Sequence, residues 1–349
     1  MDMHRQYMQR CLDLAQMGAG SVSPNPMVGA VIVHGDQIIG EGYTSPYGGP
    51  HAEVNAVSQV LDRFGNAGKE LLAASIFYVS LEPCAHFGKT PPCANMIAEL
   101  KPLKVFIACL DPYAKVNGKG VEILRSAGIE VEIGLLEKEA MWLNRRFFTR
   151  ISQHRPYVIL KWAQSKDGFI GQENKQVWIS NAASQQLTHR WRAEEDAILV
   201  GTNTARIDNP SLTVRHWKGK HPIRVLIDRD LAISSQANIF DEQAQTIVFN
   251  AKKTDWQGHI KYIELENYGL YLPQTILYQL YLMDVQSIII EGGRKTLQAF
   301  IDAGLWDEAR VFQSDEELHY GISAPVLNGR MIENRMISSD LLSVYVKLS

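Results

Sequence analysis

The chain has few cysteines, little net charge and no long apolar run, and each shortage excludes a class of protein. Four cysteines among 349 residues cannot build a disulfide framework, so free thiols in a reducing cytoplasm are expected. A net charge of −3 argues against a chain-wide basic surface for nucleic acid. No stretch reaches the ~18 apolar residues that a membrane helix needs, and residues 1–18 lack the apolar core of a signal peptide. We therefore expect a cytoplasmic protein with no membrane or nucleic-acid partner.

The length and the order of apolar segments indicate two α/β domains. A chain of 349 residues suits two domains of about 100–200 residues each. Alternating strand and helix patterns predict a layered α/β architecture in both halves. We place the domains at residues 1–147 and 148–349, and we expect residues 306–349 only to complete the second sheet. The predicted elements are a helix at 4–17, a hairpin at 27–44, a helix from His51, strands at 75–81, 104–111 and 129–134, helices at 93–101, 120–128 and 137–151, and strands at 197–201, 223–228, 246–250 and 287–290.

Two short segments contain the residue types that bind zinc. The first is "HAEVNAV" at 51–57, and the second is "EPCAHFGKTPPC" at 82–93. His51, Cys84 and Cys93 supply one imidazole and two thiolates, and a catalytic zinc site keeps three protein ligands and one open position. Cys11 lies on the apolar stripe of a helix and Cys109 lies in an apolar strand, so we expect both to be core thiols.

Glu53 indicates that the zinc site is catalytic. It stands two residues after His51 at the start of a helix, where it can take a proton from a metal-activated water and return it to a leaving amine. Taken alone, an acid at this position could simply stabilise the helix dipole. Beside a three-ligand set it is better explained as the general base and acid.

The N-terminal motifs resemble a known family. The pattern H-x-E followed by P-C and a second cysteine is similar to the zinc-dependent nucleobase deaminases. Eight residues separate Cys84 from Cys93, and the pattern P-C-x-H-x-G-x-T-P-P-C, with "SPNPMVGAVIV" at 23–33 and "GGPHAEVNA" at 48–56, resembles the deaminase domain of the bifunctional riboflavin-biosynthesis deaminase–reductases. The resemblance implies a cytidine-deaminase-like, three-layer α/β/α domain. It also implies substrate contacts from Asn25, His86 and Lys89.

Two positions depart from the family pattern. The family has a histidine where this chain has Thr44, and it has D-P-N-P where this chain has Asp111-Pro112-Tyr113-Ala114. Both positions are expected to face the substrate, so the departures concern substrate contacts and leave the zinc ligands unchanged.

The C-terminal half resembles the reductase domain of the same family, whose fold is like that of dihydrofolate reductase. The segments "LKWAQSKDGFIG" at 160–171, "VWISN" at 177–181, residues 190–215 and "EGG" at 291–293 follow in the family's order. By this resemblance, NADPH is held by Ala163, Trp178, Thr204, Asp208, Gly292, Gly293, Arg294, Lys295, Thr296 and Leu297. The phosphoribosyl substrate is held by Gln176, Arg192, Leu212, Arg215 and Glu291.

The residues of the second site also have simpler explanations. Two arginines suit a phosphate, and Glu291 at a strand end can accept sugar hydroxyls. Alternatively, Arg192 could pair with Glu195 across a helix turn, Trp178 could belong to the core, and residues 208–210 could form a turn. Glycines 292 and 293 allow a backbone approach to phosphate, but tight turns also use glycine.

The zinc-type ligands and Glu53 predict an enzyme with one zinc ion. The resemblance implies that it also uses NADPH, that it deaminates 2,5-diamino-6-ribosylamino-4(3H)-pyrimidinone 5′-phosphate, and that it then reduces the ribosyl group to ribityl. We expect small-molecule substrates and a homo-oligomer. The alternatives are a nucleic-acid base deaminase with an accessory domain and a non-catalytic zinc-binding protein.

Overall fold

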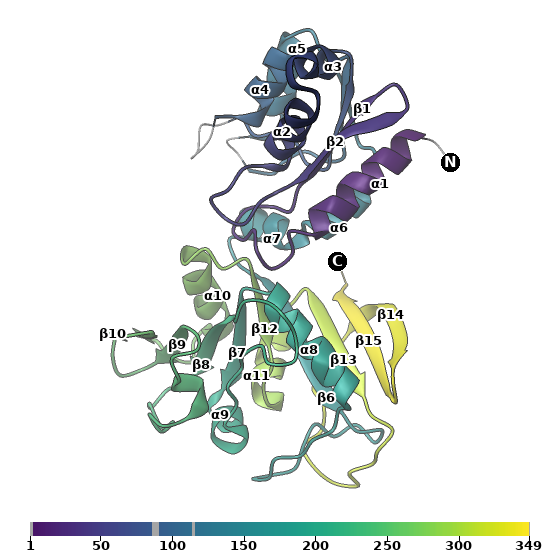
Figure 1. Cartoon of the computed structure of the whole chain (residues 1–349). Helices are drawn as coiled ribbons and strands as arrows, with labels where there is room; N and C mark the ends of the chain where they lie inside the picture. The colour runs from purple at the N-terminus through teal and green to yellow at the C-terminus, as the bar shows by residue number, and fades with distance from the viewer. Residues whose placement is uncertain (1–2, 86–90, 114–115, 349) are drawn as a thin grey trace. The chain divides into compact units, whose positions relative to one another are not determined.

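The structure is a computed structural model that describes residues 3–85, 91–113 and 116–348 (Figure 1). These residues divide into two compact units between Gln153 and His154. The predicted boundary after residue 147 falls within a helix, α7 (Arg145–Gln153), which belongs to the first unit. Phe148 of this helix packs against the first core, which explains why the whole helix stays with that unit.

The first unit is built on a mixed sheet with the strand order β2-β1-β3-β4-β5. Strand β1 pairs antiparallel with β2 and β3, and β3, β4 and β5 run parallel. Gly35 turns the β1–β2 hairpin with a positive φ of 58°, which suits a residue without a Cβ. The strands are β1 (Gly29–His34), β2 (Gln37–Tyr43), β3 (Ile76–Val79), β4 (Lys104–Ile107) and β5 (Glu130–Ile133).

Helices cover both faces of this sheet, which gives the predicted three-layer α/β/α arrangement (Figure 1). A Cβ on Gly29 would lie 1.9 Å from the carbonyl oxygen of Cys11, whereas a Cβ on Gly42 would lie 2.3 Å from that of Ala52. Gly29 and Gly42 point to opposite faces, because Gly42 is paired with the neighbour of Gly29 on β1. The helices are α1 (Met3–Gln16), α2 (Ala52–Phe64), η1 (Gly65–Ala67), α3 (Gly68–Ala73), α4 (Cys93–Leu100), α5 (Lys119–Ser126), α6 (Glu137–Leu143) and α7.

The helix predicted over residues 137–151 is wrong in one respect, because it is interrupted at Asn144. The side chain of Asn144 accepts a hydrogen bond from the Met27 N–H and donates one to the Met27 carbonyl oxygen, both at 2.8 Å. This long-range bridge holds Asn144 outside the helical conformation, so that α6 ends and α7 begins there. Periodicity along the chain carries no information about such a partner.

The second unit contains a larger sheet with the order β10-β11-β9-β8-β7-β12-β6-β13-β15-β14. The pairs from β11 to β13 are parallel, and the pairs at both ends are antiparallel. The strands are β6 (Tyr157–Gln164), β7 (Ala197–Gly201), β8 (Ile223–Ile227), β9 (Thr246–Asn250), β10 (Asp255–Gln257), β11 (Ile260–Glu264), β12 (Ser287–Ile290), β13 (Glu308–Gln313), β14 (Gly329–Ile337) and β15 (Asp340–Lys347).

Separate cores form on the two faces of the second sheet. Residues of α10 and α11, among them Ile276 and Phe300, join one core, and Trp191 of α8 and Ala205 of α9 join the other. Strands β6, β7 and β12 are parallel neighbours. Their carboxyl ends therefore meet at one edge of the sheet, where ligands bind in open α/β sheets. The helices are α8 (Ala182–Glu194), α9 (Thr202–Asp208), η2 (Asn238–Phe240), α10 (Leu272–Leu282) and α11 (Arg294–Asp302).

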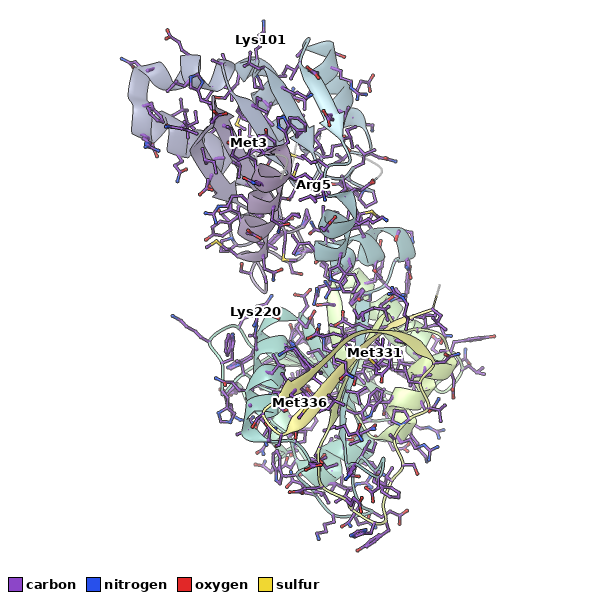
Figure 2. All side chains as sticks on the ribbon, turned by 90° about the vertical axis from the view of Figure 1, so that its right-hand side faces the viewer. Met3, Arg5, Lys101, Lys220, Met331 and Met336 are labelled. Atoms are coloured by element: carbon purple, nitrogen blue, oxygen red, sulfur yellow. The ribbon has the colours of Figure 1, made fainter. Side chains whose placement is uncertain are left out.

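The C-terminal tail completes the second sheet, as predicted. Strands β13, β15 and β14 extend it beyond β6, and β14 forms the edge. Figure 2 labels Met331 and Met336 on this edge strand, where their side chains are 48% and 59% exposed. Across the described residues, every helix is too short or too polar to span a bilayer.

Candidate active sites

The predicted zinc ligands lie together in the first unit. The Cys84 Sγ lies 3.6 Å and the Cys93 Sγ 3.4 Å from the His51 Nδ1, and the three ligand atoms all fall within 4.8 Å of one another. Tetrahedral zinc, with bonds of about 2.3 Å to sulfur and about 2.0–2.1 Å to nitrogen, places a sulfur ligand and a nitrogen ligand roughly 3.5–3.6 Å apart. The donor set and its spacing therefore fit zinc.

Different local structures position the three ligands. His51 is the N-cap of α2, and Cys93 is the first residue of α4. Cys84 lies on an irregular segment after β3, and the Cys93 N–H donates to its Sγ at 3.3 Å. Hydrogen bonds from Cys93 and His51 lower the pKa of Cys84, which favours the thiolate that a metal requires.

Glu53 lies in the first turn of α2 and is 4% exposed. Burial and the nearby Cys84 charge raise the pKa of Glu53 to about 7. A carboxyl group with such a pKa can accept and return a proton near neutral pH. A helix-stabilising acid would not need such burial.

The two other thiols belong to the core, as predicted. The Cys11 Sγ donates to the Tyr78 carbonyl oxygen at 3.3 Å, and the Cys109 Sγ donates to the Ser80 carbonyl oxygen at 3.5 Å. Burial raises the pKa of both thiols, which opposes ionisation and metal binding.

Thr44, one of the departures from the family pattern, is buried, and its hydroxyl bridges the backbone N–H and carbonyl oxygen of Val28. At the other departure, the Tyr113 N–H donates to Asp111 Oδ1 at 2.8 Å. Asn25 lies in a turn after α1, where its N–H donates to the Val22 carbonyl oxygen. The predicted substrate residues His86 and Lys89 lie outside the described residues.

In the second unit, the structure pairs two of the predicted substrate residues. Glu291 follows β12, and its carboxylate accepts hydrogen bonds from the Arg192 guanidinium of α8 at 2.8 and 3.4 Å. The Arg192 charge, followed by that of Lys161, lowers the pKa of Glu291 to about 2 despite its desolvation. Arg192 therefore pairs with Glu291, and Glu195 forms an ion pair with Arg310 at 3.4 Å.

Sequence analysis missed Lys161, a partly buried cation on β6. Desolvation lowers the pKa of Lys161, and the charge of Glu291 opposes that shift. Lys161 is one position beyond Leu160, which pairs with Ile290 immediately before Glu291. The sequence did contain a signal for it, because Lys161 is the one charged residue in the apolar segment "YVILKWA", and lysines are rarely buried.

Several of the predicted cofactor residues converge at the ends of β7 and β12. The Gly293 N–H donates to Thr204 Oγ1 at 2.9 Å, and a Cβ on Gly201 would lie 2.6 Å from Thr296 Oγ1. Gly293 caps α11, so the first N–H groups of that helix point from the same edge of the sheet. This arrangement suits a phosphate-bearing cofactor. Arg294, Lys295 and Leu297 continue in α11, and Gly292 precedes it.

The remaining predicted residues lie around this edge. Ala163 is on β6, and Asp208 ends α9, where burial raises the pKa of its carboxyl. Leu212 is buried, whereas Gln176 and Trp178 lie on an exposed loop. Trp178 is 68% exposed, so the alternative that it belongs to the core is wrong.

The stability of the second unit is expected to fall between about pH 6.5 and pH 4 because of His189. Burial, then Arg192 and Arg215, lower the pKa of His189 to about 4, and its Nδ1 accepts the Arg215 N–H at 3.2 Å. In this window the unfolded chain binds a proton that the folded chain excludes, so stability decreases as pH falls. Denaturant unfolding at pH 7 and pH 4.5 should show a smaller loss for His189→Asn than for wild type. The control His319→Asn, at a side chain 78% exposed, should follow wild type; equal losses in all three proteins contradict this account.

Two family models match the chain. The cytidine and deoxycytidylate deaminase zinc-binding region matches residues 1–109, and the RibD C-terminal domain matches residues 156–314. These ranges lie on either side of the division between the two compact units.

Relatives match over nearly the whole length. The riboflavin biosynthesis protein RibD of Aquifex aeolicus is 39% identical over 96% of this chain and 93% of its own length, and that of Bacillus amyloliquefaciens is 37% identical over 97% and 89%. The crystal structure of a diaminohydroxyphosphoribosylaminopyrimidine deaminase/5-amino-6-(5-phosphoribosylamino)uracil reductase from Thermotoga maritima is 34% identical, with a TM-score of 0.90 over 99% of both chains. With a zinc site in the first unit and a dihydrofolate-reductase-like second unit, the chain belongs to the RibD family of bifunctional riboflavin-biosynthesis deaminases and reductases.

Proposed function

We propose that this enzyme deaminates 2,5-diamino-6-ribosylamino-4(3H)-pyrimidinone 5′-phosphate and then reduces the ribosyl group of the product to ribityl with NADPH. The observation that supports this most strongly is the buried Glu53 carboxyl beside three potential zinc ligands, in the same chain as a partly buried group of Lys161, Glu291 and Arg192. The name of the Thermotoga maritima enzyme agrees with this order, because it gives a uracil as the substrate of the reductase.

In the deaminase unit, His51, Cys84 and Cys93 hold zinc, which when bound activates a water for attack on the amine-bearing ring carbon. Glu53 accepts a proton from the water and delivers it to the departing amino nitrogen. The carbon–oxygen bond forms, the carbon–nitrogen bond breaks, and ammonia leaves. The high pKa of Glu53 suits both halves of this transfer.

In the reductase unit, the nicotinamide cofactor NAD(P)H supplies the hydride, and we propose NADPH as the form used. Lys161 would protonate the ribose ring oxygen as its bond to C1 breaks, because burial makes its ammonium a better acid. Glu291 would accept hydrogen bonds from sugar hydroxyls and keep Lys161 and Arg192 in place. The Thr204–Gly293 contact and the N-terminus of α11 support a cofactor phosphate at the same sheet edge.

The two alternative functions agree less well with these sites. A nucleic-acid base deaminase has no use for the second unit, and a net charge of −3 provides no electrostatic attraction for a phosphate backbone. A purely structural zinc protein would not need a buried Glu53. We also propose a cytoplasmic homo-oligomer, which the exposed Met331 and Met336 on edge strand β14 support.

Replacing Arg215 with alanine should raise the reductase KM for the phosphorylated substrate about 10- to 100-fold, because charge-assisted hydrogen bonds contribute about 1.5–3 kcal/mol each. Arg215 lies close enough to Arg192 that the two charges interact, as expected of a shared phosphate site. The KM for NADPH should stay unchanged, and Arg215→Lys should recover only part of the loss.

Arg190→Ala is the matched control for Arg215→Ala. Arg190 lies on α8 and forms an exposed ion pair with Glu194 at 2.8 Å, and such pairs contribute little. Steady-state kinetics with each reactant varied in turn should leave both KM values of this control unchanged. If Arg215→Ala raised only the KM for NADPH, Arg215 would be assigned to the cofactor site. If neither KM value changed, Arg215 would not belong to the reductase site.

A further inference from the structure

Glu82 is a buried carboxylate that the deamination mechanism does not use. It lies two residues before the zinc ligand Cys84 and is 3% exposed. Its Oε1 accepts hydrogen bonds from the Gly120 N–H at 2.9 Å and the Val121 N–H at 3.2 Å. Glu82 therefore binds the first turn of α5, which is distant in the sequence.

The second carboxylate oxygen of Glu82 binds the loop that leads to α5. Its Oε2 accepts the Gly118 N–H at 3.0 Å and the Asp111 N–H at 3.2 Å. One buried side chain thus satisfies four backbone donors, and hydrogen bonds to a charged group are about twice as strong as neutral ones. Through these bonds Glu82, which precedes Pro83, is attached to Asp111 and to residues 118–121.

The backbone of the two segments is also in close contact. A Cβ on Gly120 would lie 2.2 Å from the Pro83 carbonyl oxygen, so a side chain there would push the segments apart. On the other side, the Glu82 N–H donates to the Cys109 carbonyl oxygen at 3.0 Å. The segment that leads to Cys84 is therefore fixed on both sides.

Cys84 needs such support more than the other two ligands. His51 and Cys93 are held at the starts of α2 and α4, whereas Cys84 lies outside any helix or strand. Among the described residues, its carbonyl oxygen accepts the Ala94 N–H at 3.1 Å, and two residues earlier Glu82 anchors the same segment through its carboxylate. Residues that orient metal ligands commonly affect affinity about 10- to 100-fold.

We propose that Glu82 is a positioning residue that fixes the Cys84 thiolate for zinc by joining its segment to Asp111 and to residues 118–121. Zinc binding and the order of residues 118–121 are then coupled. The inference rests on the zinc site and requires none of the substrate contacts proposed above.

Glu82→Gln is the test, because the substitution keeps the volume of the side chain but places an NH₂ group against backbone donors. We expect the dissociation constant for zinc, measured by competition with a chromogenic chelator, to rise about 10- to 100-fold. The thiolate-to-cobalt absorption of the cobalt-substituted protein should also shift. The control Glu122→Gln, at an exposed acid in the first turn of the same helix, should behave as wild type.

Unchanged zinc affinity and an unchanged cobalt spectrum in folded Glu82→Gln, or an equal loss in Glu122→Gln, would overturn the proposal. Reductase turnover reports only on the second unit, so folding of the first unit is checked by denaturant unfolding followed by far-UV circular dichroism, compared with wild type. If the first unit of the variant does not fold, hydrogen exchange of the wild-type protein with and without zinc tests the proposed coupling instead. We expect zinc to slow exchange of the Gly118, Gly120 and Val121 amides, and identical exchange with and without zinc overturns the coupling.

Discussion

Replacing Glu53 with glutamine should leave zinc bound and lower kcat for deamination about 10²- to 10⁴-fold, the range that general acid–base catalysis contributes. Glutamine keeps the size of the side chain in its buried position but cannot carry the proton from water to the leaving amine. The ligand atoms of His51, Cys84 and Cys93 are untouched, so metal content should stay at the wild-type level. Ammonia release and zinc content are measured on the same sample.

Asp62→Asn is the matched control for Glu53→Gln. Asp62 lies on the same helix, α2, but is exposed. Its substitution should change neither zinc content nor ammonia release. Normal zinc with undiminished deamination in Glu53→Gln would remove Glu53 from catalysis. A loss of zinc in that variant would instead assign Glu53 to the metal site itself.

Changing Cys84 to serine should abolish zinc binding and deamination and leave the reductase active on substrate that is already deaminated. A catalytic zinc has only three protein ligands, so the loss of one thiolate removes a large part of the binding energy. Lys161, Arg192 and Glu291, which we propose for the reductase site, all belong to the second compact unit. NADPH oxidation by this variant, with the deaminated substrate, measures the separation of the two activities.

Cys109→Ala controls for the loss of a buried thiol from the first unit, since the Cys109 Sγ donates to the Ser80 carbonyl oxygen and lies outside the group formed by His51, Cys84 and Cys93. It should keep zinc and deamination. If folded Cys84→Ser also lost NADPH oxidation, the two sites would not be independent. Full deamination without zinc would contradict the metal assignment.

Short-range patterns predicted the three zinc ligands correctly. Two of the zinc ligands lie at helix starts, and the third lies in a segment with a recognisable motif. His51 caps α2 and Glu53 is in its first turn, so local helix geometry alone sets their separation. Most of the predicted strands and helices likewise follow from periodicity, whereas the three strands of the tail had no periodic signal of their own. Such features depend on a few neighbouring residues.

Features that depend on distant partners were missed. The break at Asn144 comes from its bonds to Met27, and the role of Glu82 comes from four N–H groups around residues 111–121. Lys161 comes near Glu291 only because β6 and β12 pair in the folded sheet. Pairing across a parallel sheet is not encoded by local spacing, and the sequence alone could not supply it.

The most direct test of two consecutive reactions is to supply purified 2,5-diamino-6-ribosylamino-4(3H)-pyrimidinone 5′-phosphate and follow ammonia release and NADPH oxidation together. We expect full ammonia release without NADPH, and on adding NADPH one equivalent oxidised per molecule already deaminated. Under the same conditions Glu53→Gln should show neither signal, but should oxidise NADPH when given the deaminated compound. NADPH oxidation by Glu53→Gln on the diamino substrate, or ammonia release that requires NADPH, would contradict the account.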